Sequence, residues 1–104
     1  MNRVFRALSD PTRRRVLQLL RDRPMTAGEL ADEFALTKAT MSGHFNVLRE
    51  AGLVDADRRR TTITYRLQMS VLEDALLGFV ESFGFELRLG ARTPTADRIA
   101  KREA

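Results

Sequence analysis

The sequence predicts a small, mainly helical domain with one β-hairpin, in the element order ααααββα. Three observations predict this fold class. Apolar residues recur every three or four positions over most of the first 52 residues. They then alternate with polar residues over positions 53–68. Threonine, serine or aspartate precedes most of the expected helices, and glycine follows two of them.

The first two helices are expected in the first 24 residues. The first spans Asn2–Leu8, and its apolar residues have helical spacing: Val4, Phe5 and Leu8. The second begins at Asp10 and Pro11, because aspartate caps a helix and proline fits the first helical position. It ends before Pro24, since a residue that precedes proline avoids the helical region. Its core face consists of Val16, Leu17, Leu19 and Leu20.

The next two helices form a helix-turn-helix pattern. Thr26 to Glu29 is a capping box that opens the third helix. The inner face of this helix consists of Leu30, Ala31 and Phe34. A three-residue connection ends at Thr37, which caps a fourth helix from Lys38 to about Ala51. The fourth helix has one apolar stripe, Met41, Phe45 and Leu48, and Gly52 ends it in the left-handed conformation.

A hairpin and a last helix complete the domain. Strands are expected over Leu53–Ala56 and Thr62–Gln68, and the five residues between them form a basic tip. Ser70 and Glu73 form a second capping box, and Gly84 ends the last helix. We therefore expect a domain in residues 1–84. Residues 85–104 are a C-terminal tail, either flexible or with a short helix near Thr93.

Composition excludes many kinds of site. The chain has no cysteine and one histidine, which excludes disulfides, thiolate catalysis, cysteine metal sites and multi-histidine zinc sites, so no cofactor is predicted. The net charge of +4 favours an anionic partner, first nucleic acid and second an acidic membrane surface. No signal peptide is apparent, and the longest apolar run, Ala75–Val80, is too short to span a membrane. We expect a cytoplasmic protein.

The predicted elements form a winged helix-turn-helix, whose fourth helix would enter the major groove of DNA while the basic hairpin contacts phosphates. No acidic residue occurs from Ala35 to Asn46, and the exposed face there is polar and mostly small. The alternative for the fourth helix is an ordinary polar face, and the alternative for the hairpin tip is a solvated turn. The candidate DNA-binding residues are Arg13, Arg14, Thr37, Lys38, Thr40, Ser42, Gly43, His44, Asn46, Arg58, Arg59 and Arg60.

Two of these predictions have specific alternatives. Cations in the first turns of a helix oppose its dipole, so Arg13, Arg14 and Arg15 suggest a nearby phosphate, or pairing with Asp10. His44 lies on the flank of the fourth helix and is either a DNA contact or a hydrogen-bonded structural histidine. It is also the only histidine that could act as a base. Because it lacks a glycine-rich elbow and an evident pocket, no enzymatic activity is expected.

The last helix has more large apolar residues than a small core needs, which indicates a dimer interface. With the first helix, the candidate interface residues are Val4, Phe5, Leu8, Leu72, Leu76, Phe79, Val80 and Phe83.

Three segments resemble the ArsR family of bacterial winged-helix repressors: Phe5–Arg13, Thr37–Phe45 and Leu48–Val54. The chain is most similar to the SdpR-like autorepressors, which lack metal-binding cysteines. The resemblance implies a homodimer through the first and last helices that represses transcription at an inverted repeat. It also implies, in the SdpR-like case, release from DNA by a partner protein.

The sequence departs from the family pattern at several positions. Members often have proline where Ala39 stands and arginine or histidine where Gly43 stands. Thr26–Gly28 occupies the place of the cysteine pair of metal-sensing members, and the last helix has carboxylates but no histidine. A metal site is therefore not expected. The predicted function is a dimeric DNA-binding repressor; the alternatives are a ligand-sensing repressor and a protein-interaction module that no longer binds DNA.

Overall fold

The computed structural model describes residues 2–86 and contains five helices and three short strands in that range, in the order α1–α2–β1–α3–α4–β2–β3–α5. The chain divides into two compact units, the first ending at Leu72 and the second beginning at Glu73. The mainly helical fold with a hairpin agrees with the expected class. The tail beyond residue 86, including the helix expected near Thr93, lies outside the described residues.

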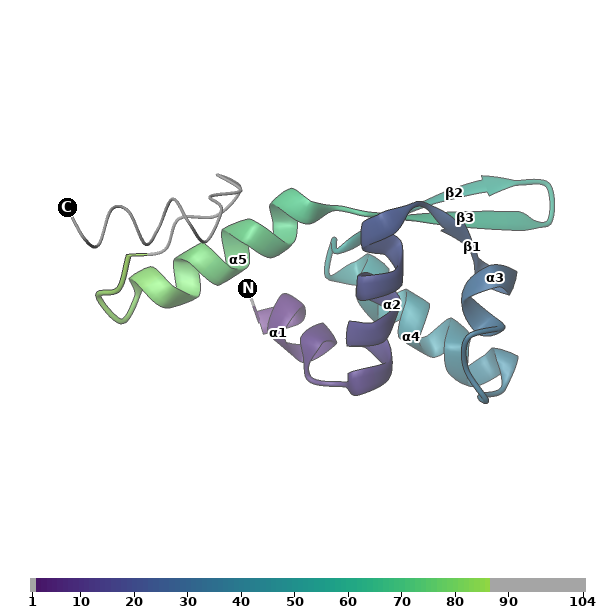
Figure 1. Ribbon diagram of the computed structural model, residues 1–104, viewed down its shortest axis with the longest axis horizontal. Coiled ribbons are helices and arrows are strands. Elements are labelled where there is room, and N and C mark those ends of the chain that lie inside the picture. Colours follow the sequence, from purple (N-terminus) through teal and green to yellow (C-terminus); the bar gives the residue numbers. More distant parts are fainter. Residues whose placement is uncertain (1, 87–104) are drawn as a thin grey trace, which may run out of the picture. The chain divides into compact units, whose positions relative to one another are not determined.

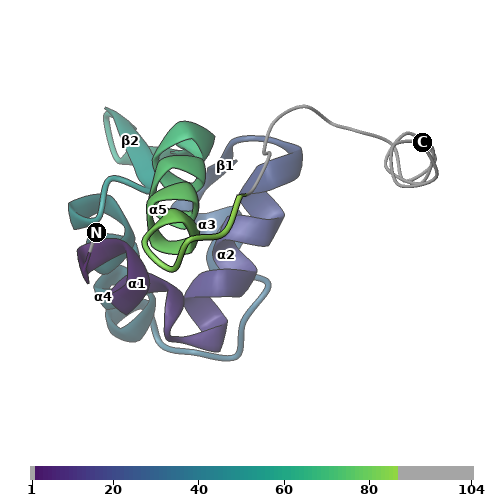
Figure 2. The ribbon, with the colours of Figure 1, turned by 90° about the vertical axis from the view of Figure 1, so that its left-hand side faces the viewer.

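The helices α1 (Asn2–Leu8) and α2 (Pro11–Asp22) begin and end where the sequence predicts. Asp10 is the N-cap of α2, because its Oδ2 accepts a hydrogen bond from the backbone N–H of Arg13 at 3.1 Å. In both ribbon views α1 lies beside α2 and α4 (Figures 1 and 2).

The helix α3 (Ala27–Ala31) is shorter than expected. The predicted capping box is present: Thr26 Oγ1 accepts from Glu29 N, and Glu29 Oε1 accepts from Thr26 N. After Ala31 the chain continues in tight turns rather than in a helix, with Phe34 N donating to Ala31 O at 3.0 Å. Phe34 therefore lies outside the helix that was expected to contain it, and six residues, 32–37, separate α3 from α4 instead of three.

The helix α4 (Lys38–Glu50) agrees with its prediction. Thr37 Oγ1 caps it by accepting from Thr40 N at 3.1 Å, and Gly52 follows it with a φ of 77°. The predicted stripe of Met41, Phe45 and Leu48 is buried.

The strands form a three-stranded antiparallel sheet in the order β1–β3–β2, in which β1 (Met25–Thr26) was not predicted (Figure 1). β2 (Val54–Arg59) and β3 (Thr62–Leu67) pair over their full lengths. The hairpin loop is thus two residues, Arg60 and Thr61, and not the expected five. We call this hairpin the wing.

The core of the first unit lies between the helices and one face of this sheet. The rings of Phe45 on α4 and Tyr65 on β3 pack with centroids 4.7 Å apart, which anchors the wing to α4. The other buried side chains are Val4, Ala7, Val16, Leu17, Leu20, Met25, Leu30, Met41, Leu48, Leu53 and Val54.

The helix α5 (Met69–Glu81) begins two residues earlier than expected, since a helix capped by Ser70 would begin at Val71. Ser70 therefore lies in its first turn, and the capping box predicted for Ser70 and Glu73 is wrong. The reason is that Gln68 already joins the sheet to the helix: its N–H donates to Leu53 O at 2.9 Å, and its carbonyl accepts from Val71 N at 3.1 Å. Gly84, with a φ of 82°, ends the turns that follow α5, so Phe83 lies beyond the helix.

Candidate nucleic-acid interface

The exposed face of α4 is the first component of the candidate interface. Because Met41, Phe45 and Leu48 hold the opposite face in the core, the side chains between them point outward. Gly43 has no heavy atom within 4 Å of the position that a Cβ would occupy, so the helix backbone is accessible there. The exposed predicted residues on or next to this face are Thr37, Lys38, Thr40, Ser42, Gly43 and Asn46.

Hydrogen bonds within the protein occupy part of this polar face. The Thr37 hydroxyl accepts from Thr40 N and also donates to Thr40 Oγ1 at 2.9 Å, so it is engaged in capping the helix. Asn46 Oδ1 accepts from Arg49 Nη2 at 3.3 Å, and the exposed Asn46 side chain keeps its amide N–H groups as donors. The sequence interpretation did not include Arg49. Its spacing of three residues from Asn46 on an exposed helix is the signal that could have identified it.

The wing is the second component, and its three arginines have different environments. Residues alternate between the two faces of a strand, so Arg58 shares a face with Tyr65, and Arg59 shares the other face with Asp57. Arg59 Nε donates to Asp57 Oδ2 at 3.1 Å. Arg60 occupies the loop with a φ of 57°, a conformation that is uncommon for residues other than glycine. All three side chains are exposed.

The pKa of Tyr65 responds to two arginines. Burial raises the pKa of the Tyr65 phenol above its ordinary value of 10.0, and the positive charges of Arg49 and Arg58 act in the opposite direction. Arg49 and Arg58 thus add positive potential at the contact between α4 and the wing, to which Tyr65 belongs.

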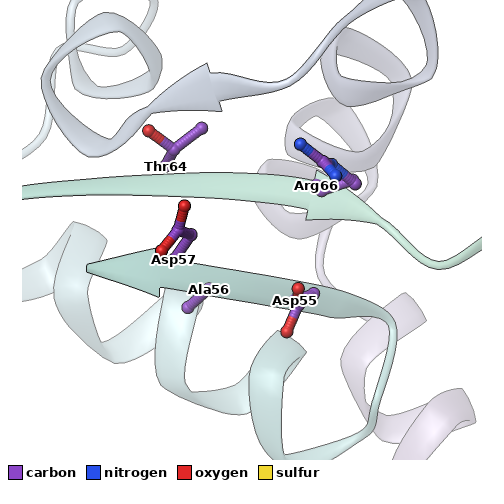
Figure 3. A pocket seen from close by; sticks show the side chains of 5 residues that line it. All are labelled: Asp55, Ala56, Asp57, Thr64 and Arg66. Carbon is purple, nitrogen blue, oxygen red and sulfur yellow. The ribbon is translucent and has the colours of Figure 1, made fainter. Parts of the chain in front are cut away.

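The outer face of the wing has a mixed charge near its base (Figure 3). Asp55 lies opposite Arg66, and Asp57 lies opposite Thr64 across the two strands. With Ala56 these residues line a shallow cavity of about 200 Å³. The two carboxylates would repel a phosphate backbone, so the wing presents phosphate-binding charge at its tip and on the face of Arg58 rather than at this base.

Arg13 and His44 lie together beside the turn between α1 and α2. Arg13 Nη1 lies 3.1 Å from His44 Nδ1, and Asp10 Oδ2 lies 3.9 Å from the same nitrogen. Arg13 also donates to two backbone carbonyls of α1, those of Ala7 and Arg6. Its neighbour Arg14 is exposed and has one hydrogen bond, from Nη1 to Leu8 O at 2.7 Å.

The pKa of Asp10 reflects this cluster. Burial acts to raise the pKa of this carboxyl, but hydrogen bonds from the backbone N–H groups of Arg13 and Thr12 and the charges of His44 and Arg13 outweigh it. The pKa of Asp10 is therefore below its ordinary value, and the carboxylate is ionised at neutral pH.

A further cavity of about 240 Å³ lies between α3 and α4. Its lining consists of Ala27, Gly28, Ala31, Lys38, Met41, Ser42 and Phe45. Within residues 2–86 no three side chains of histidine, cysteine, aspartate or glutamate lie close enough together to hold a metal ion. No helix in that range is long and apolar enough to cross a membrane.

The candidate dimer residues differ in exposure. Val4 is only 6% exposed in the single chain, so it belongs to the core and is not available to a partner. Phe79 at 45% and Phe83 at 66% are exposed, and their rings contact each other edge to face with centroids 5.2 Å apart. The remaining residues are partly buried: Phe5, Leu8, Leu72, Leu76 and Val80.

Comparisons with known proteins agree with this arrangement. Residues 8–57 match a helix-turn-helix domain family. The chain is 43% identical over 76 residues to the transcriptional repressor SdpR of Bacillus subtilis, a match that covers 73% of the chain and 84% of SdpR. It is 46% identical over 65 residues to the regulator KmtR of Mycobacterium tuberculosis, which covers 62% of the chain and half of KmtR.

Solved structures give the same result. A crystal structure of an ArsR family transcriptional regulator superposes with a TM-score of 0.70 at 28% identity, and the match covers 82% of this chain and 97% of the chain in that structure. The relatives are named as regulators of transcription, in agreement with the prediction that the chain is not an enzyme. Taken with the fold and the exposed basic surface, these matches establish that the chain belongs to the ArsR family of winged helix-turn-helix, DNA-binding transcriptional regulators.

Proposed function

We propose that the protein is a cytoplasmic, dimeric repressor that binds an inverted-repeat operator in double-stranded DNA, including one at its own promoter. The observation that carries the proposal is the exposed face of α4, which has no acidic residue from Lys38 to Asn46 and lies next to the basic wing. The name of SdpR, a transcriptional repressor that shares 43% of its residues over the match, supports the direction of regulation.

Four cations per protomer are available for phosphate contact in this proposal: Arg14, Lys38, Arg58 and Arg60. Arg13 is not included because its Nε, Nη1 and Nη2 all have partners within the protein, and Arg59 is not included because it pairs with Asp57. Arg14 uses only Nη1, on Leu8 O, and is otherwise exposed. A dimer would neutralise about eight phosphates, so the logarithm of affinity should fall with the logarithm of salt concentration at a slope of about −7.

Base readout is assigned to the middle of the α4 face. The free amide N–H groups of Asn46 suit an acceptor on a base edge, and Ser42 can donate or accept. Two-fold symmetry would present two α4 helices to successive major grooves about 34 Å apart, which requires an imperfect palindrome.

The experiment is a fluorescence anisotropy titration with the duplex upstream of the protein's own coding region and with a scrambled duplex of equal length. Asn46→Ala should weaken binding to the first duplex and leave the second unchanged, whereas Lys38→Gln should weaken both. Absence of binding to both duplexes at low salt would favour a protein-interaction module instead. Calorimetry with small metabolites and with a candidate partner protein then tests whether a ligand or a protein releases the DNA.

A further inference from the structure

We infer that His44 and Arg13 position the recognition helix α4 against the α1–α2 turn, and that this arrangement, not a contact with DNA, is their role in binding. The inference rests on the proposed DNA-binding function and concerns how the free protein prepares the surface for it.

Arg13 connects three elements of the first unit. Its Nε donates to Ala7 O at 2.8 Å and its Nη2 donates to Arg6 O at 3.0 Å, which satisfies carbonyls at the C-terminal end of α1. Its Nη1 reaches His44 Nδ1 on α4 at 3.1 Å, although Arg13 itself is in α2. Three of the five N–H donors of this guanidinium are thus used inside the protein, and they fix its plane.

His44 faces the interior of this junction. Its side chain is only 15% exposed, and it immediately precedes the buried Phe45 on α4. A side chain directed at α1 and α2 cannot at the same time point into a groove that faces the opposite side of α4.

The donor and acceptor roles follow from the chemistry of the guanidinium group. Arginine only donates, so His44 Nδ1 is the acceptor in this contact. A proton on Nδ1 would face a cation and abolish the hydrogen bond. Asp10 Oδ2, 3.9 Å away, is the acceptor that a protonated Nδ1 would then approach.

The ring therefore has two charged neighbours, Arg13 at 3.1 Å and Asp10 at 3.9 Å from Nδ1. Among residues 2–86, Asp10 and Arg13 are the charged groups within bonding or ion-pair distance of the ring. The packed helix α1 faces the cluster with backbone carbonyls, and β2, which also packs on α4, contributes no such group.

Salt dependence distinguishes positioning from phosphate contact. For Arg13→Gln we expect operator affinity to fall about tenfold per protomer, the usual effect of losing a partly buried, charge-assisted hydrogen bond. The salt slope should stay that of the wild type. In the matched variant Arg14→Gln, which changes the neighbouring exposed arginine, the slope should become shallower by about 1.8 per dimer. A slope in Arg13→Gln that is shallower by the same amount would assign Arg13 to phosphate and overturn the inference.

Two substitutions of the ring test His44. Glutamine can accept from Arg13 through its Oε1, so His44→Gln should keep operator affinity within about threefold of the wild type. His44→Ala, which removes the acceptor, should lose about tenfold. A His44→Gln protein that loses as much affinity as His44→Ala, or a His44→Ala protein with wild-type affinity, would overturn the inference.

A measurement on the free protein separates this inference from the proposed function. Hydrogen exchange of the α4 amides should be faster in Arg13→Gln than in the wild type and unchanged in Arg14→Gln. If the wild-type protein binds no DNA, the proposed function fails and the exchange experiment still tests the positioning. Equal protection of α4 in Arg13→Gln and in the wild type would overturn the inference even where DNA binds.

Discussion

Arg59 Nε donates to Asp57 Oδ2 at 3.1 Å, an ion pair between two residues that strand alternation places on the face of the wing opposite Arg58. Both partners are well exposed, at 84% and 56%, so the pair contributes little to stability. Its consequence concerns charge, because the wing tip has three arginines but a carboxylate engages one of them.

Removal of this carboxylate should strengthen DNA binding. In Asp57→Asn the Arg59 guanidinium is released, and the salt slope of a dimer should steepen by about 1.8 while affinity rises a few fold at moderate salt. Stability should change by less than about 0.5 kcal/mol. Anisotropy titrations over a salt series measure the slope. Asp55→Asn, two residues further from the tip on the same face, is the control, and an equal gain there would show that only net charge matters.

Arg60 should be replaceable by glycine with a gain in stability. Its φ of 57° at the first position of a two-residue hairpin loop, with Thr61 outside the positive region, fits a type II′ turn that favours glycine there. Arg60→Gly should stabilise the protein by about 1 kcal/mol in urea unfolding while weakening its binding to all DNA sequences. Thr61→Gly should give no gain. A destabilised Arg60→Gly protein would mean that the loop is not strained.

Replacement of Gly43 by alanine should stabilise the protein but weaken its binding to the operator. Alanine fits there without contact, since no atom lies within 4 Å of its Cβ position, and it should stabilise α4 by about 1 kcal/mol. Operator affinity should nevertheless fall, because the added methyl group occupies space that the bases would enter. Glu50→Ala, at the far end of the same face, should retain affinity. If Gly43→Ala binds the operator as well as the wild type, Gly43 does not approach the bases.

The elements that local signals predicted correctly are those whose ends depend on residues close in sequence. Asp10, Thr26 and Thr37 each cap the helix that follows, because a side-chain oxygen needs to reach only two or three residues along the chain. Ser70 is followed by Glu73 in the same capping pattern, but it does not cap a helix, because α5 already begins at Met69. The preceding residue, Gln68, is held by a hydrogen bond to Leu53, and no local sequence signal predicts this contact.

The errors arose where distant pairing decides the structure. Asp57 to Arg59 have low strand propensity, yet they extend β2 because β3 offers a full ladder of partners in register. The two-residue strand β1 exists only through its pairing with β3 and has no local signal. The surroundings of Arg13 also depend on residues distant in sequence. That its guanidinium lies between α1 carbonyls and His44 could be found only once the helices were packed together, and the predicted phosphate contact of Arg13 stays a prediction.

Tyr65 provides a spectroscopic probe of the contact between α4 and the wing. It is the only tyrosine, and the chain has no tryptophan. Burial raises its pKa above 10.0 while Arg49 and Arg58 act to lower it, so the tyrosinate absorbance should appear above pH 10.0, and at still higher pH in Arg58→Ala.

The same group makes stability depend on pH. The pKa in the folded state lies above the unfolded value, so the stabilisation is complete below about pH 10 and is lost as the pH rises through the folded pKa. Urea unfolding at several alkaline pH values should show this decline, which Tyr65→Phe should reduce. An Arg58→Ala protein with an unshifted titration would remove Arg58 from the neighbourhood of Tyr65.

The exposed aromatic residues at the end of α5 should control dimerisation. Phe79 and Phe83 together present two rings per protomer, and burying each partly exposed ring in a two-fold interface contributes about 1 kcal/mol. Phe79→Ser combined with Phe83→Ser should therefore raise the dimer Kd by about a thousandfold, measured by analytical ultracentrifugation over a concentration series. Leu36→Ser is the matched control, because Leu36 is a similarly exposed apolar residue (43%) outside α5. A double variant that remains dimeric at the concentrations at which the wild type is dimeric would exclude the last helix as the interface. A monomer that keeps its far-ultraviolet spectrum and loses operator binding would instead connect dimerisation directly to DNA recognition.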